Sequence, residues 1–111
     1  MWIFMNDAML SIVEHRGKPD HLLVRGRIKG DIERVFPDAR AKYTPLSDYG
    51  YRADVHRDAV SSVLKTKIEN ISYDNFKSSV REPDRSDAYY GVWNCMYQEQ
   101  HRRWELIDEE V

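Results

Sequence analysis

The segment His21–Ile28 has the sequence HLLVRGRI, in which apolar positions alternate with positions that include two arginines. Successive side chains of an extended strand point to opposite faces of a sheet. One face of this segment therefore holds Leu22, Val24, Gly26 and Ile28, and the other holds Leu23, Arg25 and Arg27. This alternation predicts a half-buried β-strand whose apolar side lies on the core.

The residues before this strand predict further extended structure. Two apolar runs, Trp2–Met5 and Ala8–Val13, are joined by two polar residues. The pattern fits either a tight hairpin or one long bent strand. The stretch Arg16–Asp20 contains a glycine and a proline, and it predicts a turn before His21.

A short helix and a second hairpin are expected after the strand. The helix opens at Gly30, Asp31 can cap its first turn, and Pro37 ends it. Ala39–Pro45 and Asp48–Val55 are expected to be strands joined by a turn. In the second of these, one side is expected to hold Tyr49, Tyr51, Ala53 and Val55, and the other Arg52, Asp54 and His56.

Two helices are predicted in the last half of the chain. Arg57–Ile71 has a helical period, with one side formed by Val60, Val63, Leu64, Ile68 and Ile71. A loop follows, in which Asn75 is expected to hold a turn and Phe76 to pack into the core. Pro83 suits the first turn of the last helix, whose apolar stripe consists of Tyr89, Val92, Trp93, Met96, Gln100 and Trp104.

This order of elements predicts an α+β fold. We expect an antiparallel sheet of four to five strands with helices packed on one face, and the run His21–Ile71 is compatible with a ferredoxin-like arrangement. The length predicts a single domain over residues 1–111, with residues 106–111 as a frayed tail.

Composition limits the function classes. The chain is 41% hydrophobic and 32% charged, with a net charge of −2, which is typical of a globular protein and unlike a general polyanion binder or an acidic DNA mimic. The single Cys95 excludes an internal disulfide and a cysteine-based zinc site, and it is expected to be a buried thiol. Without a signal peptide or an apolar span, we expect a cytoplasmic protein that does not enter membranes.

Arginines form the first candidate site. If the strands containing Arg25, Arg27 and Arg52 are neighbours, three guanidinium groups gather on one sheet face and could bind an anion, RNA or an acidic partner. The alternative is a solvated face on which these arginines pair with Glu14 and Asp54 across the strands. A second basic group, Lys77 and Arg81 with Arg85, is interleaved with Glu82, Asp84 and Asp87.

Aromatic side chains on the last helix form another candidate site. Tyr, Trp and Met are enriched in protein interfaces, and one small core cannot hide so many of them. The expected interface residues are Tyr89, Trp93, Tyr97 and Trp104. The alternative is core packing with scattered exposure.

Signals for catalysis are weak. Asp54 and His56 share one strand face and could form an acid–base pair, but four scattered histidines make such pairs common by chance. The sequence contains no recognisable metal-ligand spacing, glycine-rich phosphate loop or nucleophile elbow, so no metal and no cofactor are expected.

Several segments resemble a family of short uncharacterised bacterial and mobile-element proteins. They are Leu22–Arg27, Gly30–Glu33, Asp48–Arg52, Tyr73–Val80 and Tyr89–Met96. The resemblance runs from Trp2 to about Gln100, and its most specific part is the Tyr-Asp-Asn-Phe-Lys-Ser stretch with the following Tyr…Val-Trp helix. It implies no catalytic residues. By type and size, the chain is also similar to accessory proteins of phages and mobile elements that inhibit host defence systems.

Together these features favour a non-enzymatic binding domain that acts through a protein partner or as a homodimer. The alternative is a nucleic-acid-binding domain in which the sheet arginines, Lys77, Arg81 and Arg85 meet phosphates. A small hydrolase-like enzyme using Asp54 and His56 is the third hypothesis.

Overall fold

The computed structural model describes the backbone of residues 1–110 and the side chains of residues 1–107. Contacts within the chain divide it into two compact units, Met1–Asp74 and Asn75–Val111. Each unit is described by itself. The expectation of a single domain stays a prediction.

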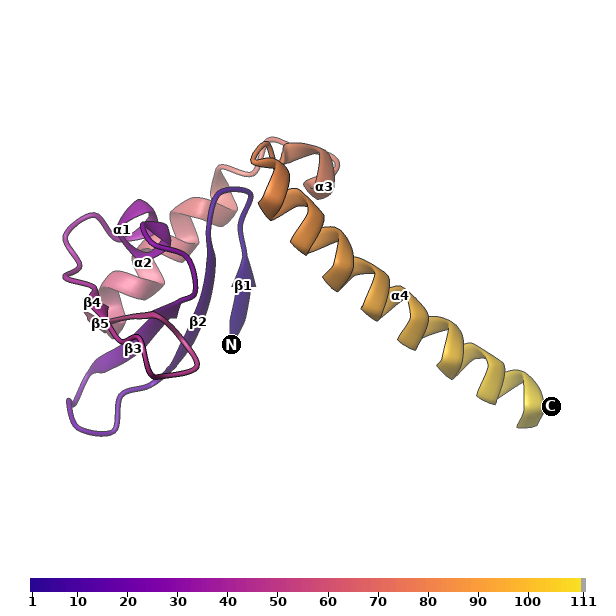
Figure 1. Ribbon diagram of the computed structural model, residues 1–111, viewed down its shortest axis with the longest axis horizontal. Coiled ribbons are helices and arrows are strands. Elements are labelled where there is room, and N and C mark those ends of the chain that lie inside the picture. Colours follow the sequence, from indigo (N-terminus) through magenta and orange to yellow (C-terminus); the bar gives the residue numbers. More distant parts are fainter. Residues whose placement is uncertain (111) are drawn as a thin grey trace. The chain divides into compact units, whose positions relative to one another are not determined.

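The first unit is built on one sheet (Figure 1). Its elements are β1 (Trp2–Phe4), β2 (Met9–Glu14), β3 (His21–Gly26), α1 (Asp31–Val35), β4 (Lys42–Tyr43), β5 (Tyr51–His56) and α2 (Arg57–Glu69). The five strands are ordered β1-β2-β3-β5-β4, and every neighbouring pair is antiparallel. The predicted α+β fold is therefore confirmed, and the first two apolar runs form a hairpin.

A hydrophobic core lies between the sheet and helices α1 and α2. Its buried residues come from one face of the strands and from both helices: Ala8, Leu10, Ile12, Val24, Ile32, Val35, Phe36, Ala53, Val55 and Val60. Gly26 lies opposite α1, and a Cβ at this position would come within 3.3 Å of Ile32 Cγ1. The alternation of β3 thus places Val24 and Gly26 against the helices, as predicted, but β3 ends at Gly26 and the expected core residue Ile28 is exposed.

Part of this unit has a split β-α-β arrangement. Helix α1 connects β3 to β4, and β5 lies between these two strands in the sheet. This is the strand order expected for half of a ferredoxin-like domain. The position on the other side of β3 is taken by β2, which precedes β3 in the chain.

Asp31 does not cap α1 as expected. Gly30 occupies the N-cap position with a left-handed backbone (φ 94°), and Asp31 is the first helical residue. Its carboxylate is fully buried, accepts a hydrogen bond from the backbone N–H of Met9 (3.0 Å), and pairs with Arg34 (3.0 Å). The side chain therefore joins α1 to strand β2, a long-range contact that local sequence does not indicate.

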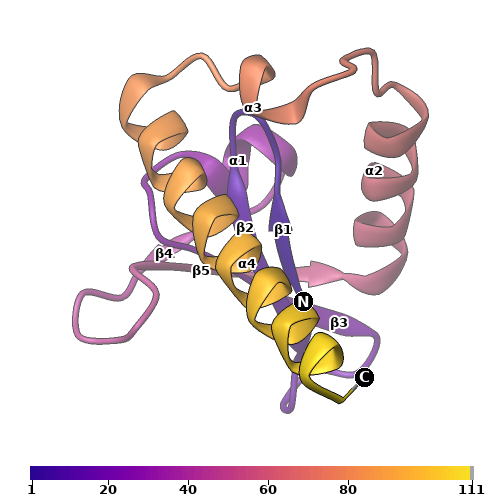
Figure 2. The ribbon, with the colours of Figure 1, turned by 90° about the vertical axis from the view of Figure 1, so that its right-hand side faces the viewer.

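The second unit consists of α3 (Phe76–Ser79) and α4 (Pro83–Glu110), and α4 is one continuous helix (Figure 1 and Figure 2). The Asn75 side chain accepts a hydrogen bond from the backbone N–H of Ser78 (3.1 Å) and so caps α3, where a turn within a loop was expected. Phe76 stacks on Tyr89, with 5.9 Å between ring centroids.

Helix α4 starts at Pro83, as predicted, and includes most of the segment expected to fray. Residues 106–110 are helical, and Val111 lies outside the described residues. The expectation of a buried Cys95 is wrong, because this thiol is exposed on α4. No helix in the described part of the chain is long and apolar enough to cross a membrane.

Candidate functional site

Large aromatic side chains lie exposed along α4. Tyr90, Trp93, Tyr97 and Trp104, here called the aromatic face, each leave between 40% and 58% of their surface accessible. Three of the four predicted interface residues therefore lie in the open. The fourth, Tyr89, is only 8% exposed and packs on Phe76.

Successive rings of the aromatic face contact one another. Trp93 stacks on Tyr90 (5.7 Å between centroids) and on Tyr97 (5.0 Å). His101 continues the series, with edge contacts to Tyr97 (4.4 Å) and Trp104 (5.2 Å). Offset stacks of this kind stabilise the rings beyond the area they bury. The rings therefore form one ordered surface rather than separate exposed side chains.

Lys77, a predicted anion-binding residue, belongs to this surface. Its ammonium nitrogen lies 4.0 Å from the centroid of Trp93 and 5.8 Å from that of Tyr90. Such a cation–π contact orients the lysine side chain over the ring. The structure thus places Lys77 at the first turns of the aromatic face.

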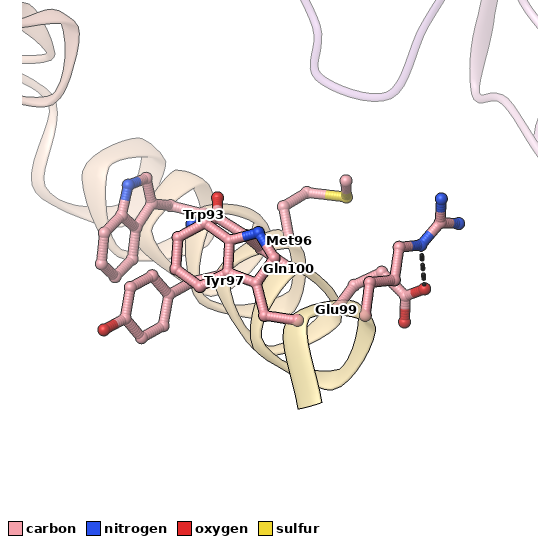
Figure 3. A pocket seen from close by; sticks show the side chains of 7 residues that line it. Trp93, Met96, Tyr97, Glu99 and Gln100 are labelled. Carbon is pink, nitrogen blue, oxygen red and sulfur yellow. Dashed lines mark hydrogen bonds and ion pairs between the residues drawn. The ribbon is translucent and has the colours of Figure 1, made fainter. Parts of the chain in front are cut away.

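A hollow of about 470 Å³ lies along the same helix (Figure 3). Its lining residues are Trp93, Met96, Tyr97, Glu99, Gln100, Arg103 and Trp104. Figure 3 shows Trp93 and Tyr97 on one side of this surface and Glu99 on the other. The hollow is therefore bounded by aromatic groups on one flank and charged groups on the other.

Glu99 holds the charged flank together. Its carboxylate accepts hydrogen bonds from Arg102 (2.6 Å to Nη2) and Arg103 (2.8 Å to Nε). The bond with Arg102, followed by that with Arg103, lowers the pKa of Glu99 from its ordinary 4.5 to about 2, and the same contact raises the pKa of Arg102. This carboxylate is ionised throughout the physiological range.

The sheet arginines come together as predicted, on the face opposite the core. Arg25 is the direct cross-strand partner of Arg52, and Lys42 continues the row on β4. Their partners are not the expected Glu14 and Asp54. Arg25 donates to Ser11 Oγ (2.7 Å), and Arg52 pairs with the Asp48 carboxylate (3.0 Å).

Tyr49 lies at the centre of the arginine cluster. The guanidinium carbons of Arg25 and Arg27 lie 4.5 Å and 4.2 Å from its ring centroid. Tyr49 was expected to share a strand face with Tyr51, but it precedes β5 and lies on the arginine side. A hydrogen bond with Ser11, and then the charges of Arg27 and Arg25, lower the pKa of the Tyr49 hydroxyl despite its burial.

Arg25 is largely committed to this internal cluster. Its Nε is buried and has no hydrogen-bond partner among the described residues, while its Nη2 is held by Ser11. Arg27 donates to the backbone carbonyl of Asp48 (2.9 Å). The cluster therefore fixes the loop before β5 onto the sheet.

Asp54 and His56 share a strand face but have different partners. Asp54 lies 2.9 Å from His15 Nε2, and Lys18 Nζ lies 3.8 Å from its other oxygen. The backbone N–H of Asp58 donates to His56 Nδ1 (3.1 Å), so His56 caps α2. The other nitrogen of His15 accepts a hydrogen bond from the backbone N–H of Gly17 (3.1 Å), so both ring nitrogens of this residue have a partner.

The remaining predicted basic residues do not join the sheet arginines in one unit. Lys77 and Arg81 belong to the second unit, whereas Arg25, Arg27 and Arg52 belong to the first. Arg85 is 2% exposed and donates to Glu82 (3.2 Å), so it does not present its charge to a phosphate. Within the described residues, no group of three His, Cys, Asp or Glu side chains could hold a metal ion.

Sequence reasoning missed Tyr90 as a member of the aromatic face and Tyr49 as a partner of the arginines. Tyr90 could have been found by counting, because it lies three residues before Trp93 and seven before Tyr97. For Tyr49 no local signal existed, since its position depends on where the strand begins. No protein-family model, curated protein or solved structure matches this chain.

Proposed function

We propose that this protein is a non-enzymatic binding module that engages another protein chain through the aromatic face of α4. That chain is either a different protein or a second copy of this one. The observation that supports the proposal is the continuous series of exposed, mutually stacked rings at Tyr90, Trp93, Tyr97 and Trp104. Exposed apolar groups that gather in one patch mark interaction sites, whereas scattered ones need no explanation.

The geometry of the rings favours a protein over a nucleic acid as the partner. A base stacks on the free face of an aromatic ring. Trp93 has Tyr90 and Tyr97 stacked against it, so its edge is more available than its faces. The chain also has a net charge of −2, and Arg25 and Arg27 are engaged with Tyr49. Edge contacts to apolar side chains of a protein suit this surface better than base stacking.

The contacts of Asp54 are consistent with a non-enzymatic role. Its carboxylate is held by His15 and Lys18, and His56 serves as a helix cap. A general base needs a free lone pair within reach of a substrate. Asp54 therefore pairs with His15, and not with the His56 that the acid–base hypothesis requires.

An affinity pull-down with nuclease treatment tests the proposal. Tagged full-length protein, Trp104→Ala and the control Trp2→Ala are compared, since each variant removes one exposed tryptophan. We expect a partner chain that survives nuclease, is retained by Trp2→Ala, and binds Trp104→Ala at least about tenfold more weakly, as for a tryptophan buried in an interface. Equal capture by the two variants, or capture only through nucleic acid, would contradict it.

A further inference from the structure

We infer that the partner is a second copy of this chain, and that the two α4 helices pack against each other as a coiled coil. This inference rests on the proposed function of the aromatic face. It is carried by the spacing of the exposed residues, by the spacing of the residues that line the hollow and by the distribution of charge along α4.

The exposed residues follow a heptad pattern. Starting from Tyr90, steps of three and four residues alternate through Trp93, Tyr97, Gln100, Trp104 and Ile107, which we call the α4 seam. All six side chains are exposed, and five of them are aromatic or aliphatic. Alternating spacings of three and four place residues on the a and d positions that two supercoiled helices bury between them. The seam extends over about five helical turns.

Most residues that line the hollow have the spacing of a coiled-coil packing site. In a coiled coil, each a or d side chain inserts between four residues of the facing helix, at spacings of three, four and seven. Trp93, Met96, Tyr97 and Gln100 have this spacing, and all four line the hollow of about 470 Å³. Arg103 and Trp104, which also line it, continue the pattern by one heptad. The same helix therefore offers both the protruding side chains and the spaces that receive them.

Charge also favours a second copy. No residue of the seam carries a formal charge, although the Lys77 ammonium lies over Trp93 at its start. From Tyr97 to Ile107, seam residues of two copies can therefore meet without repulsion between like charges. Beside the seam, Arg102 and Arg103 are already paired with Glu99 of their own chain. These pairs reduce the need for an oppositely charged foreign surface.

Gln100 suits a symmetric interface in particular. A two-fold interface brings the same patch of both subunits together, so it must be complementary to itself. A side-chain amide is both donor and acceptor and can therefore satisfy a polar group of an identical chain. One polar residue within an apolar seam is a known means of fixing register and oligomeric state, at some cost in stability.

Stability gives a physical reason for this pairing. An isolated helix is marginal in water, and helices in proteins are stabilised mainly by packing an amphipathic face. Helix α4 has 28 residues, and its described contacts within its own unit are with α3, near its start. Pairing two α4 helices would bury the seam of both copies.

Mass measurement of the full chain by light scattering tests the inference. We expect the wild-type protein to have twice the 13.2 kDa mass of one chain. Tyr97→Glu places a charge in the seam and should reduce the mass to that of one chain. Gln98→Glu adds the same charge at the adjacent exposed position outside the seam and should leave the dimer intact.

A second variant guards against misfolding as an explanation. Gln100→Leu replaces the polar seam residue with an apolar one, which should lower the dimer dissociation constant by at least about tenfold. A wild-type monomer, a Tyr97→Glu dimer or no change with Gln100→Leu would each overturn the inference. A wild-type monomer that still captures a different protein, lost on Tyr97→Glu, would leave the proposed function standing. A monomer that captures no such protein would contradict both.

Discussion

Tyr49 shows how a few charged side chains organise a loop. This residue is 4% exposed and belongs to the loop before β5, and the guanidinium groups of Arg25 and Arg27 both contact its ring. Nearby, the Thr44 and Ser47 hydroxyls donate to the Tyr49 carbonyl (2.7 Å and 2.6 Å). Cation–π contacts are stronger when water is excluded, which suits this buried ring. The arginines therefore act first as parts of the fold.

Tyr49 should ionise below the ordinary pKa of a tyrosine. Its pKa is lowered in the folded protein from the ordinary 10.0, so folding favours the ionised form. The stabilisation from this shift is fully present above pH 10.0 and is lost as the pH falls through the folded pKa. Ultraviolet titration should show one of the seven tyrosines ionising below pH 10.0, and Tyr49→Phe should remove that phase.

The control for this titration is Tyr43→Phe, which removes an exposed tyrosine on β4. We expect the early phase to persist in this variant. If the early phase instead disappeared with Tyr43→Phe, or survived Tyr49→Phe, the placement of Tyr49 against the two arginines would be wrong.

Single residues were the hardest to predict from sequence. Strand alternation placed Arg25 and Arg52 on the polar sides of their strands, whereas the direct pairing of the two residues depends on a strand order and register that the sequence did not indicate. The buried carboxylate of Asp31 and the exposed thiol of Cys95 were not predicted either. Both depend on what other elements cover those positions, and a local pattern of residues does not contain that information.

At the scale of elements, α4 is unusual because its charged pairs and its apolar seam occupy separate flanks. Glu99, Arg102 and Arg103 are spaced at three and four residues, so they meet on one side of the helix. The seam lies beside them and remains exposed. Helix α4 can therefore be solvated on one side and covered by a partner on the other.

The ionisation of Glu99 should be measurable directly. Carboxyl carbon chemical shifts followed by NMR should give a pKa of about 2 for Glu99, compared with an ordinary 4.5. Because the folded pKa is lower, the stabilisation of α4 by this group is complete above pH 4.5 and is lost as the pH falls toward 2. Arg102→Ala should raise the pKa of Glu99 more than Arg103→Ala does, because the hydrogen bond with Arg102 lowers this pKa more.

Lys65→Ala is a suitable comparison, because it removes a cation from α2 that is paired with Glu69 rather than with Glu99. This variant should leave the Glu99 titration unchanged. A Glu99 pKa near 4.5 in the wild-type protein would mean that the two arginines do not hold the carboxylate in solution.

The elements themselves could largely be predicted from sequence. Apolar residues that recur at every second position predicted the strands, and those that recur about every 3.6 positions predicted the helices. Pro37 and Pro83 marked helix boundaries correctly. The expected strand Ala39–Pro45 contains only Lys42–Tyr43, because just these residues pair with β5. Strand ends depend on the available pairing partner, so they were predicted less well than strand positions.

On the scale of the whole molecule, the core and the proposed binding surface belong to different units. Every residue of the core cluster lies between Ala8 and Val60, and the partly buried residues packed on it extend only from Ile3 to Leu64. The aromatic face lies entirely within residues 75–111. Changes on this face are therefore expected to alter binding without removing a side chain from the core cluster.

This separation predicts that residues 1–74 fold without the remainder. The fragment keeps all five strands, α1, α2 and the whole core cluster. We expect a dispersed amide NMR spectrum and a single cooperative urea transition, because small domains with a complete core unfold in an all-or-none manner. The fragment should also be monomeric, since it lacks α4. A collapsed fragment without a cooperative transition would show that residues 75–111 are needed to complete the first unit, and would favour the single domain that chain length predicts. A folded fragment that still dimerises would instead move the self-association surface from α4 to the sheet unit.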